Sequence, residues 1–280
     1  EVYTRVTLCL DAALVQQRTL ITRLEHVDMT SYEHIDAAML DISEQITSCQ
    51  NEALVAYYRK PEETADAGAA QTADEKTAEA KTLIALGAVE EATALLDEAT
   101  AAAEQSGDDR RKVDALVAAC DHALVLGEFE HALGHGRPAL ATAQKAGYAL
   151  GESDALACLG TAELRSGKFS ESRTHLETSL KIREGIYGPD HPRVADSLNR
   201  LGNLDELLAD YGKAQELYKR AHDIWTKTFG PTDPITTRVQ HNLGAVHVGI
   251  DDLPGAVAWY TQAINSERES LGPEHPATAL

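Results

Sequence analysis

Aromatic and basic side chains are both scarce in this chain of 280 residues. Phe, Trp and Tyr make up 5% of the sequence, whereas apolar residues of all kinds make up 43%. Lys and Arg number 25 against 45 Asp and Glu, which gives a formal net charge of −20. Because such a charge repels phosphate backbones and acidic membrane surfaces, we expect no nucleic-acid partner. A protein or peptide ligand with basic flanks fits this charge better.

Long apolar runs and catalytic motifs are missing as well. No run reaches the ~18 residues of a membrane span, so we predict no direct membrane insertion by this chain, and we recognise no signal peptide. The glycine-rich, His-Arg-Asp and Asp-Phe-Gly motifs of kinases do not occur, nor does a P-loop, a G-x-S-x-G elbow or an H-E-x-x-H pair. We therefore predict that the chain is not an enzyme and has no catalytic residues and no cofactor.

Only four cysteines are present. Cys9 and Cys49 lie on neighbouring elements of the N-terminal segment. They either form a disulfide, if the compartment is oxidising, or pack as two small buried side chains. We interpret Cys120 and Cys158 as packing residues near points where helices cross.

Histidines are placed where a metal site is conceivable but incomplete. His131 and His135 are four residues apart on a predicted helix, and His122 is nearby in sequence. No acidic or cysteine ligand completes this set, so we predict no metal site. His191 and His275 belong to turns between repeats, and we interpret them as structural.

A repeat with a period of 42 residues organises the second half of the chain. Leu159-Gly160 recurs as Leu201-Gly202 and as Leu243-Gly244. Each unit closes on a similar turn: Gly188-Pro189-Asp190-His191-Pro192, Gly230-Pro231-Thr232-Asp233-Pro234 and Gly272-Pro273-Glu274-His275-Pro276. A period of this length is typical of repeat architectures.

Each unit is predicted to be a pair of helices. From 193 to 208 apolar residues fall three or four apart, which is one face of a helix, and a second helix follows the turn at Tyr211-Gly212. We expect Gly230 to stop it in the αL conformation and Asp233-Pro234 to start the next helix. Small residues allow the two helices to approach closely at Gly202, Ala214 and Ala221. We interpret Trp225 and Trp259 as packing anchors between repeats.

These positions resemble tetratricopeptide (TPR) repeats of the 42-residue kind found in kinesin light chain. The resemblance implies an all-α fold, namely a TPR superhelical solenoid of about five helix-turn-helix repeats preceded by a short helical segment. We expect an N-terminal helical segment over 1–60, a linker over 61–73 and a repeat domain over 74–280. The expected repeats are 72–107, 110–147, 150–189, 192–231 and 234–273, with a sixth that starts at 276.

The first helix of each hairpin lines a concave groove in TPR proteins, so the resemblance implies that an extended peptide or a partner helix binds there. The candidate groove residues are Asp196, Asn199, Asn203, Glu206, Arg238, His241, Asn242, Thr161 and Arg165. Asparagine side chains offer both a donor and an acceptor, so they are suited to hold the backbone of an extended peptide whatever its sequence. A polar stripe that is only a solvated helix face is the alternative.

The N-terminal segment carries a second resemblance. The segment runs from Cys9-Leu10-Asp11 through a Leu-rich helix to Ser48-Cys49-Gln50 and a Pro-marked linker. This order is similar to the arrangement that precedes TPR repeats in bacterial serine/threonine kinases of the myxobacterial type. This implies the non-catalytic sensing or docking region of such a kinase. Alternatives are the repeat region of a bacterial transcriptional regulator or signalling ATPase, and a module that self-associates weakly through its open C-terminal repeat.

The ends of the sequence also bear on its origin. The chain starts at Glu1 rather than at Met and ends at Leu280, shortly after the predicted helix start at Pro276. We therefore expect a piece of a longer protein. Its compartment stays open between the cytoplasm and the extracytoplasmic side of a membrane.

Overall fold

The computed structural model describes residues 13–14, 16–22 and 66–271, and all regular secondary structure in these ranges is helical. The all-α fold predicted from the sequence is thereby confirmed. The chain divides into an N-terminal unit, Glu1–Ser166, and a C-terminal unit, Gly167–Leu280. The predicted segment over 1–60 lies mostly outside the described residues.

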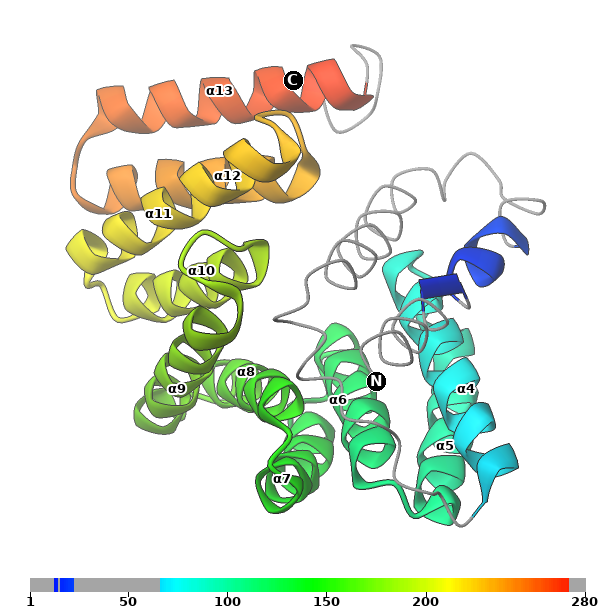
Figure 1. Ribbon diagram of the computed structural model, residues 1–280. Helices are drawn as coiled ribbons and strands as arrows, with labels where there is room; N and C mark the ends of the chain where they lie inside the picture. Colours follow the sequence, from blue (N-terminus) through cyan, green and yellow to red (C-terminus); the bar gives the residue numbers. More distant parts are fainter. Residues whose placement is uncertain (1–12, 15, 23–65, 272–280) are drawn as a thin grey trace. The chain divides into compact units, whose positions relative to one another are not determined.

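Helices of the N-terminal unit pair in chain order, as Figure 1 shows for α4 and α5. Between residues 66 and 166 they are α4 (Ala67–Ala85), α5 (Val89–Ser106), α6 (Asp109–Val125), α7 (Phe129–Ala146) and α8 (Ala149–Arg165). Each helix packs on the next one, and α6 also contacts both α4 and α8. The first helices of successive hairpins therefore touch one another, as stacked repeats require.

Helix α4 begins at Ala67, inside the range 61–73 in which the sequence predicts a linker. The carboxylate of Asp66 caps the helix by accepting a hydrogen bond from the Ala69 amide at 2.9 Å. The prediction of a linker rests on the lack of large apolar side chains. Alanine nevertheless has the highest helix propensity, and Ala73 is only 1% exposed, so small side chains are enough to bury this helix.

Helix α7 continues through Gly136-Arg137-Pro138, with Pro138 inside the helix. A methyl group at Gly136 would lie 2.8 Å from the Leu159 side chain and 3.2 Å from the sulfur of Cys120. Glycine at this position therefore lets α7 lie close to both α6 and α8, which is the reason for its presence.

A disulfide joins Cys120 in α6 to Cys158 in α8. Their Cα atoms are 6.3 Å apart, within the range that a disulfide requires. Both residues belong to a buried cluster with Leu133 and Leu159. The interpretation of the two cysteines as mere packing residues is therefore wrong. The pair is separated by 38 residues in sequence, and only the stacking of two first helices brings it together.

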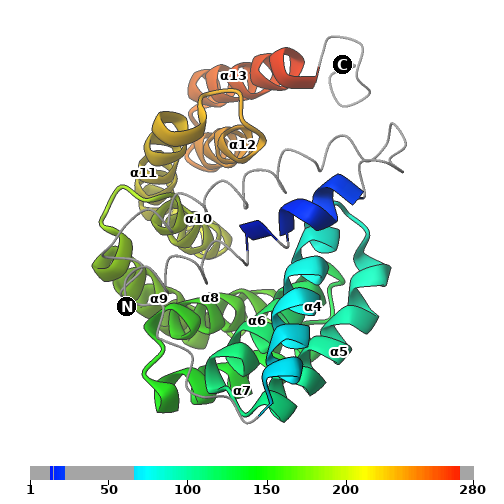
Figure 2. The ribbon, with the colours of Figure 1, turned by 45° about the vertical axis from the view of Figure 1, so that its right-hand side comes forward.

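Residues 167–271 of the C-terminal unit form five helices, which are α9 (Phe169–Tyr187), α10 (Pro192–Leu207), α11 (Tyr211–Phe229), α12 (Pro234–Gly249) and α13 (Leu253–Leu271). Figures 1 and 2 both show α11, α12 and α13 layered in chain order. Each helix contacts the next, and α10 also contacts α12. The first helices α10 and α12 thus present adjacent surfaces.

The core of this unit forms around Tyr218 and Trp225 of α11, which are 0% and 1% exposed. Their neighbours in the core are Val194, Leu198, Val239, Leu243 and Val246, with Trp259 packed at the margin. A methyl group at Gly202 would lie 2.5 Å from the Tyr218 ring. The predicted close approach of α10 and α11 is confirmed, as is the packing of the two tryptophans.

The turns between hairpins contain glycines with positive φ. Gly188 has φ 84° and ψ 167°, and Gly230 has φ 99° and ψ 166°. The prediction that Gly230 adopts the αL conformation is therefore wrong, because its ψ is extended. A positive φ combined with an extended ψ is accessible almost only to glycine, so positions 188 and 230 both require glycine.

The helix that follows each turn starts with a side-chain cap and a proline. Asp233 accepts a hydrogen bond from the Ile235 amide at 2.9 Å, as predicted. In the preceding repeat Nδ1 of His191 accepts from the Arg193 amide at 3.2 Å, and its ring stacks on Tyr187. The structural role predicted for His191 is confirmed. Burial and the charges of Arg193 and Arg183 lower the pKa of His191 to about 4.

Candidate functional site

Seven polar residues on α10 and α12 form a surface that we call the α10/α12 polar face. They are Asp196, Asn199, Asn203, Glu206, Arg238, His241 and Asn242. All seven are among the candidate groove residues of the sequence. Contact between α10 and α12 brings the two groups together.

Three asparagines of the polar face bond to one another across the two helices, and we call them the asparagine ladder. Nδ2 of Asn242 donates to Oδ1 of Asn199 at 3.0 Å and to Oδ1 of Asn203 at 3.4 Å. Asn199 is only 5% exposed, whereas Asn203 is exposed. Within the described part of the chain, the Nδ2 groups of Asn199 and Asn203 and the Oδ1 atom of Asn242 make no hydrogen bond.

Tyr218 supports the ladder from the core side. Its hydroxyl oxygen lies 2.7 Å from both Oδ1 of Asn203 and Oε2 of Glu206, and it donates its single hydrogen to one or the other of these acceptors. Burial, together with the Glu206 carboxylate, raises the pKa of Tyr218 far above its usual range, so the hydroxyl stays a donor. The groove residues predicted from the sequence do not include Tyr218. The change from Leu176 to Tyr218 at the same repeat position is the signal that points to a polar role.

Asp196 belongs to the framework of the polar face rather than to its open surface. Its carboxylate accepts from Arg183 Nη1 and from Arg200 Nε, each at 2.9 Å. Burial alone would raise the pKa of Asp196, but Arg200 and Arg183 outweigh it and hold that pKa below its usual range. Arg183 is 4% exposed and also donates to the Ser197 hydroxyl, so this ion pair anchors α9 to α10.

Arg238 and His241 complete the face on α12. His241 Nε2 lies 2.8 Å from the Glu267 carboxylate of α13. Arg238 is exposed and forms no ion pair with any residue that the structure describes. Its guanidinium is therefore available to a carbonyl or carboxylate of a ligand.

Thr161 and Arg165, the two remaining candidate groove residues, belong to the N-terminal unit. The Thr161 hydroxyl donates to the Ala157 carbonyl at 2.8 Å. The guanidinium carbon of Arg165 lies 5.5 Å from the centroid of the Phe129 ring. The α10/α12 polar face is described within the C-terminal unit alone, so a groove role for Thr161 and Arg165 stays a prediction.

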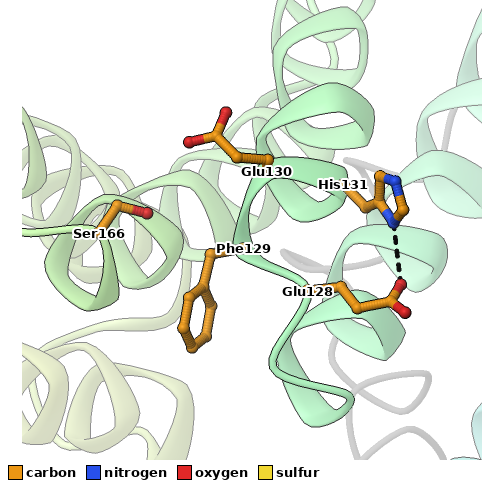
Figure 3. A pocket seen from close by; sticks show the side chains of 5 residues that line it. All are labelled: Glu128, Phe129, Glu130, His131 and Ser166. Atoms are coloured by element: carbon orange, nitrogen blue, oxygen red, sulfur yellow. Dashed lines mark hydrogen bonds and ion pairs between the residues drawn. The ribbon is translucent and has the colours of Figure 1, made fainter.

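A shallow pocket of about 390 Å³ lies at the start of α7 and the end of α8. It is lined by Glu128, Phe129, Glu130, His131 and Ser166. Figure 3 shows His131 turned toward Glu128, which it contacts at 2.9 Å, while Glu130 points away from it. Glu128, Glu130 and His131 are all exposed. The pocket therefore offers no buried polar group that would fix a ligand.

The described part of the chain contains neither a metal-binding cluster nor a membrane span. Among residues 13–14, 16–22 and 66–271, no group of three or more His, Cys, Asp or Glu side chains is placed to hold a metal ion. In the same ranges no helix has both the length and the apolar character of a membrane span. Cys9, Cys49 and His275 lie outside the described residues, so the Cys9–Cys49 disulfide stays a prediction.

Comparison with known families identifies the repeats. The model of the tetratricopeptide repeat matches residues 151–224 and 206–268. Residues 151–268 are tetratricopeptide repeats. TPR repeats generally form scaffolds for protein–protein interaction and are typically non-catalytic.

Solved structures share this TPR fold. BtubC (BKLC) from P. vanneervenii has a TM-score of 0.62 at 20% identity, covering 75% of this chain and 85% of that one. A putative kinesin light chain from Podosopora anserina gives 0.57 at 17% identity, covering 73% and 99%. A Rap protein complexed with competence and sporulation factor gives 0.67 at 12% identity, covering 96% and 77%. At these identities the likeness shows the fold alone.

Nephrocystin-3 contains a segment of related sequence. The proteins of Homo sapiens and Mus musculus are each 44% identical to this chain over 55 residues. That segment is 20% of this chain, and it spans only 4% of the length of either relative. The chain therefore matches only a small part of these relatives.

Proposed function

We propose that this chain is a protein-interaction module whose α10/α12 polar face binds an extended peptide. The observation that supports this is the asparagine ladder. An extended peptide presents carbonyl and N–H groups in alternation, and the ladder offers matching groups: Nδ2 of Asn199 and Asn203 as donors, and Oδ1 of Asn242 as an acceptor. Recognition of this kind reads the backbone and tolerates many sequences.

The surroundings of the ladder favour a rigid site. Asn242 links the side chains of Asn199 and Asn203, and Tyr218 links Asn203 to Glu206. A ligand therefore meets side chains whose orientation is already fixed, which lowers the entropy that binding costs.

Charges at the face decide which peptides fit best. The Asp196 carboxylate is already neutralised by two arginines, so it offers little to a basic ligand. Exposed Arg238 fits an acidic side chain or a carbonyl near one end of the ligand. Because the whole chain has a formal charge of −20, basic residues that flank this segment speed its association.

The test uses peptides selected from a random library on the whole chain, with affinities then measured by calorimetry. We expect the triple variant Asn199→Ala/Asn203→Ala/Asn242→Ala to bind the selected peptides at least tenfold more weakly. The control is Asn265→Ala, an exposed asparagine of α13, which should bind like the unchanged chain. Circular dichroism must show that both variants stay helical. Equal affinity of the folded triple variant would refute the proposal.

We propose further that the chain is the sensing or docking region of a bacterial serine/threonine kinase. This rests on the sequence resemblance of the N-terminal segment, most of which lies outside the described residues. Reading the coding sequence upstream of Glu1 tests it. A kinase domain is the expected result, whereas a nucleotide-binding or DNA-binding module would contradict it.

A further inference from the structure

Four large apolar side chains are exposed where the first helices of the C-terminal unit end. Leu207 is 60% exposed, Leu208 43%, Val248 49% and Ile250 46%. We call these four residues the turn-edge patch. Leu208 and Ile250 occupy the same position in successive repeats, 42 residues apart. The patch is thus built by two neighbouring turns.

Tyr211 makes the patch continuous between the two turns. A methyl group at Gly249 would lie 2.5 Å from the Tyr211 ring, so this ring rests directly on the end of α12. Gly249 is flanked by Val248 and Ile250, and Tyr211 follows Leu208 at the start of α11. An aromatic ring therefore lies between the apolar residues of one turn and those of the next.

Acidic side chains border this patch and are held in place. Asp210 accepts from Lys213 Nζ at 2.6 Å, and Asp252 accepts from His247 at 2.7 Å and from the Gly255 amide at 3.0 Å. The Lys213 contact lowers the pKa of Asp210, and the Gly255 amide followed by His247 lowers that of Asp252. Both therefore stay ionised at neutral pH.

Two more acidic residues are adjacent to the turn-edge patch in sequence. Glu206 precedes Leu207, and Asp251 follows Ile250. Asp251 is exposed and has no ion pair with a residue in the described ranges. Lys213 is the only Lys or Arg within four residues of the patch or of Tyr211 in sequence. Arg173 of α9 also acts on Asp210, but it is paired with the Asp205 carboxylate, so acidic groups still outnumber basic ones at the border.

We propose that the turn-edge patch docks an amphipathic helix of a partner protein, with apolar residues on one face and Lys or Arg beside them. Adjacent packed helices are about 8–10 Å apart, and side chains at i and i+7 of an α-helix are about 10 Å apart. One partner helix therefore reaches both turns. Its basic residues meet the acidic border.

A second copy of this chain is a poorer occupant of the patch. The same acidic border would then lie on both sides of the interface, and like charges in contact cost free energy. The Val125 and Leu126 pair at the end of α6 is also exposed, at 58% and 40%. The equivalent turn of the next repeat has Arg165 and Ser166, so no second apolar turn extends that pair.

The test measures binding of a labelled 14-residue helical peptide of Leu and Lys by fluorescence anisotropy, with the whole chain. A peptide with Glu in place of every Lys and one with Ser in place of every Leu serve as comparisons. We expect the Leu/Lys peptide alone to bind, and the variant Leu208→Ser/Ile250→Ser to weaken it at least tenfold. The control variant Val125→Ser/Leu126→Ser removes as many exposed apolar residues and should leave the affinity unchanged.

Other results would overturn the proposal. If Leu208→Ser/Ile250→Ser bound the Leu/Lys peptide as tightly as the unchanged chain does, the peptide would bind elsewhere on this acidic protein. If the Leu/Glu peptide bound as tightly as the Leu/Lys peptide, the acidic residues beside the patch would have no role in choosing the ligand. A dimer in sedimentation that Leu208→Ser/Ile250→Ser dissolves would make a second copy the occupant. The asparagine-ladder triple variant should retain this binding, which separates the patch from the α10/α12 polar face.

Discussion

At the scale of single residues, glycines mark where two helices meet at the shortest distance. Gly202 faces the fully buried ring of Tyr218, and a methyl group there would lie 2.5 Å from it. We predict that Gly202→Ala destabilises the C-terminal unit by about 1–3 kcal/mol, because overpacking outweighs the gain in helix propensity. Urea unfolding followed by circular dichroism measures the change.

A matched substitution separates packing from propensity. Gly185 in α9 has open space around it, so Gly185→Ala should stabilise the protein by up to about 1 kcal/mol. Equal effects of Gly185→Ala and Gly202→Ala would mean that the close contact with Tyr218 has no energetic weight. The Tyr218 hydroxyl also contacts Asn203, so Gly202→Ala should weaken peptide binding when the affinity is measured by calorimetry.

His191 gives the C-terminal unit a dependence on pH. Its pKa is about 4 in the folded chain, below the ~6.5 of an unfolded histidine. Between these values the unfolded chain binds a proton that the folded chain does not, so stability falls as the pH falls. After allowance for solvent screening, we expect the cap to lose about 1 kcal/mol between pH 7 and pH 5.

The variant His191→Asp isolates this effect, because Asp233 already caps the next repeat with a carboxylate. We predict that the free energy of unfolding of His191→Asp falls less between pH 7 and pH 5 than that of the unchanged chain. The ten other histidines are common to both proteins. Parallel curves for the two proteins would show that His191 accepts a proton as readily folded as unfolded.

At the scale of elements, the disulfide between α6 and α8 links two successive first helices. We predict that Cys120→Ala/Cys158→Ala lowers the free energy of unfolding by about 2–4 kcal/mol without reductant, mainly because the unfolded chain loses a closed loop. Thermal unfolding compares the two proteins. Alkylation of Cys120 and Cys158 in the non-reduced, denatured chain would contradict the link, as would equal stability.

The sequence predicts the helical hairpins well because their signals are local. Apolar spacing, a capping residue and a turn glycine each act within a few residues, and the starts at His191 and Asp233 follow from them. The start of α4 at Ala67 is harder to predict, because alanine gives no apolar periodicity. The pairing of Cys120 with Cys158 depends on how helices stack, which the spacing of cysteines does not encode.

The candidate site is predictable only in part, for a similar reason. A step of three or four residues places Asn199 and Asn203 on one face of α10. It does not say that Asn242 bonds to both, nor that Asp196 is neutralised by Arg183 from the previous helix. These contacts depend on side-chain orientation across helices, and they separate residues that hold the site from residues that face a ligand.

At the scale of the whole molecule, acidic charge is uneven. Residues 66–166 contain 18 Asp and Glu against eight Lys and Arg, whereas residues 167–271 contain 15 against 12. A basic ligand is therefore attracted by the whole chain but meets a nearly balanced C-terminal unit. We predict that raising salt from 0.05 M to 0.5 M slows association of a basic-flanked peptide several-fold, while its dissociation rate changes less. Stopped-flow fluorescence measures both rates.

The central claim is that the asparagine ladder holds the backbone of an extended peptide. Calorimetry with a selected peptide and a series of its single N-methylated analogues tests it most directly, since each methyl removes one N–H donor and leaves the side chains intact. We predict that one analogue binds at least tenfold more weakly to the unchanged chain. The same analogue and its parent should bind equally to the Asn242→Ala variant. Unchanged affinity across the whole series would contradict the account.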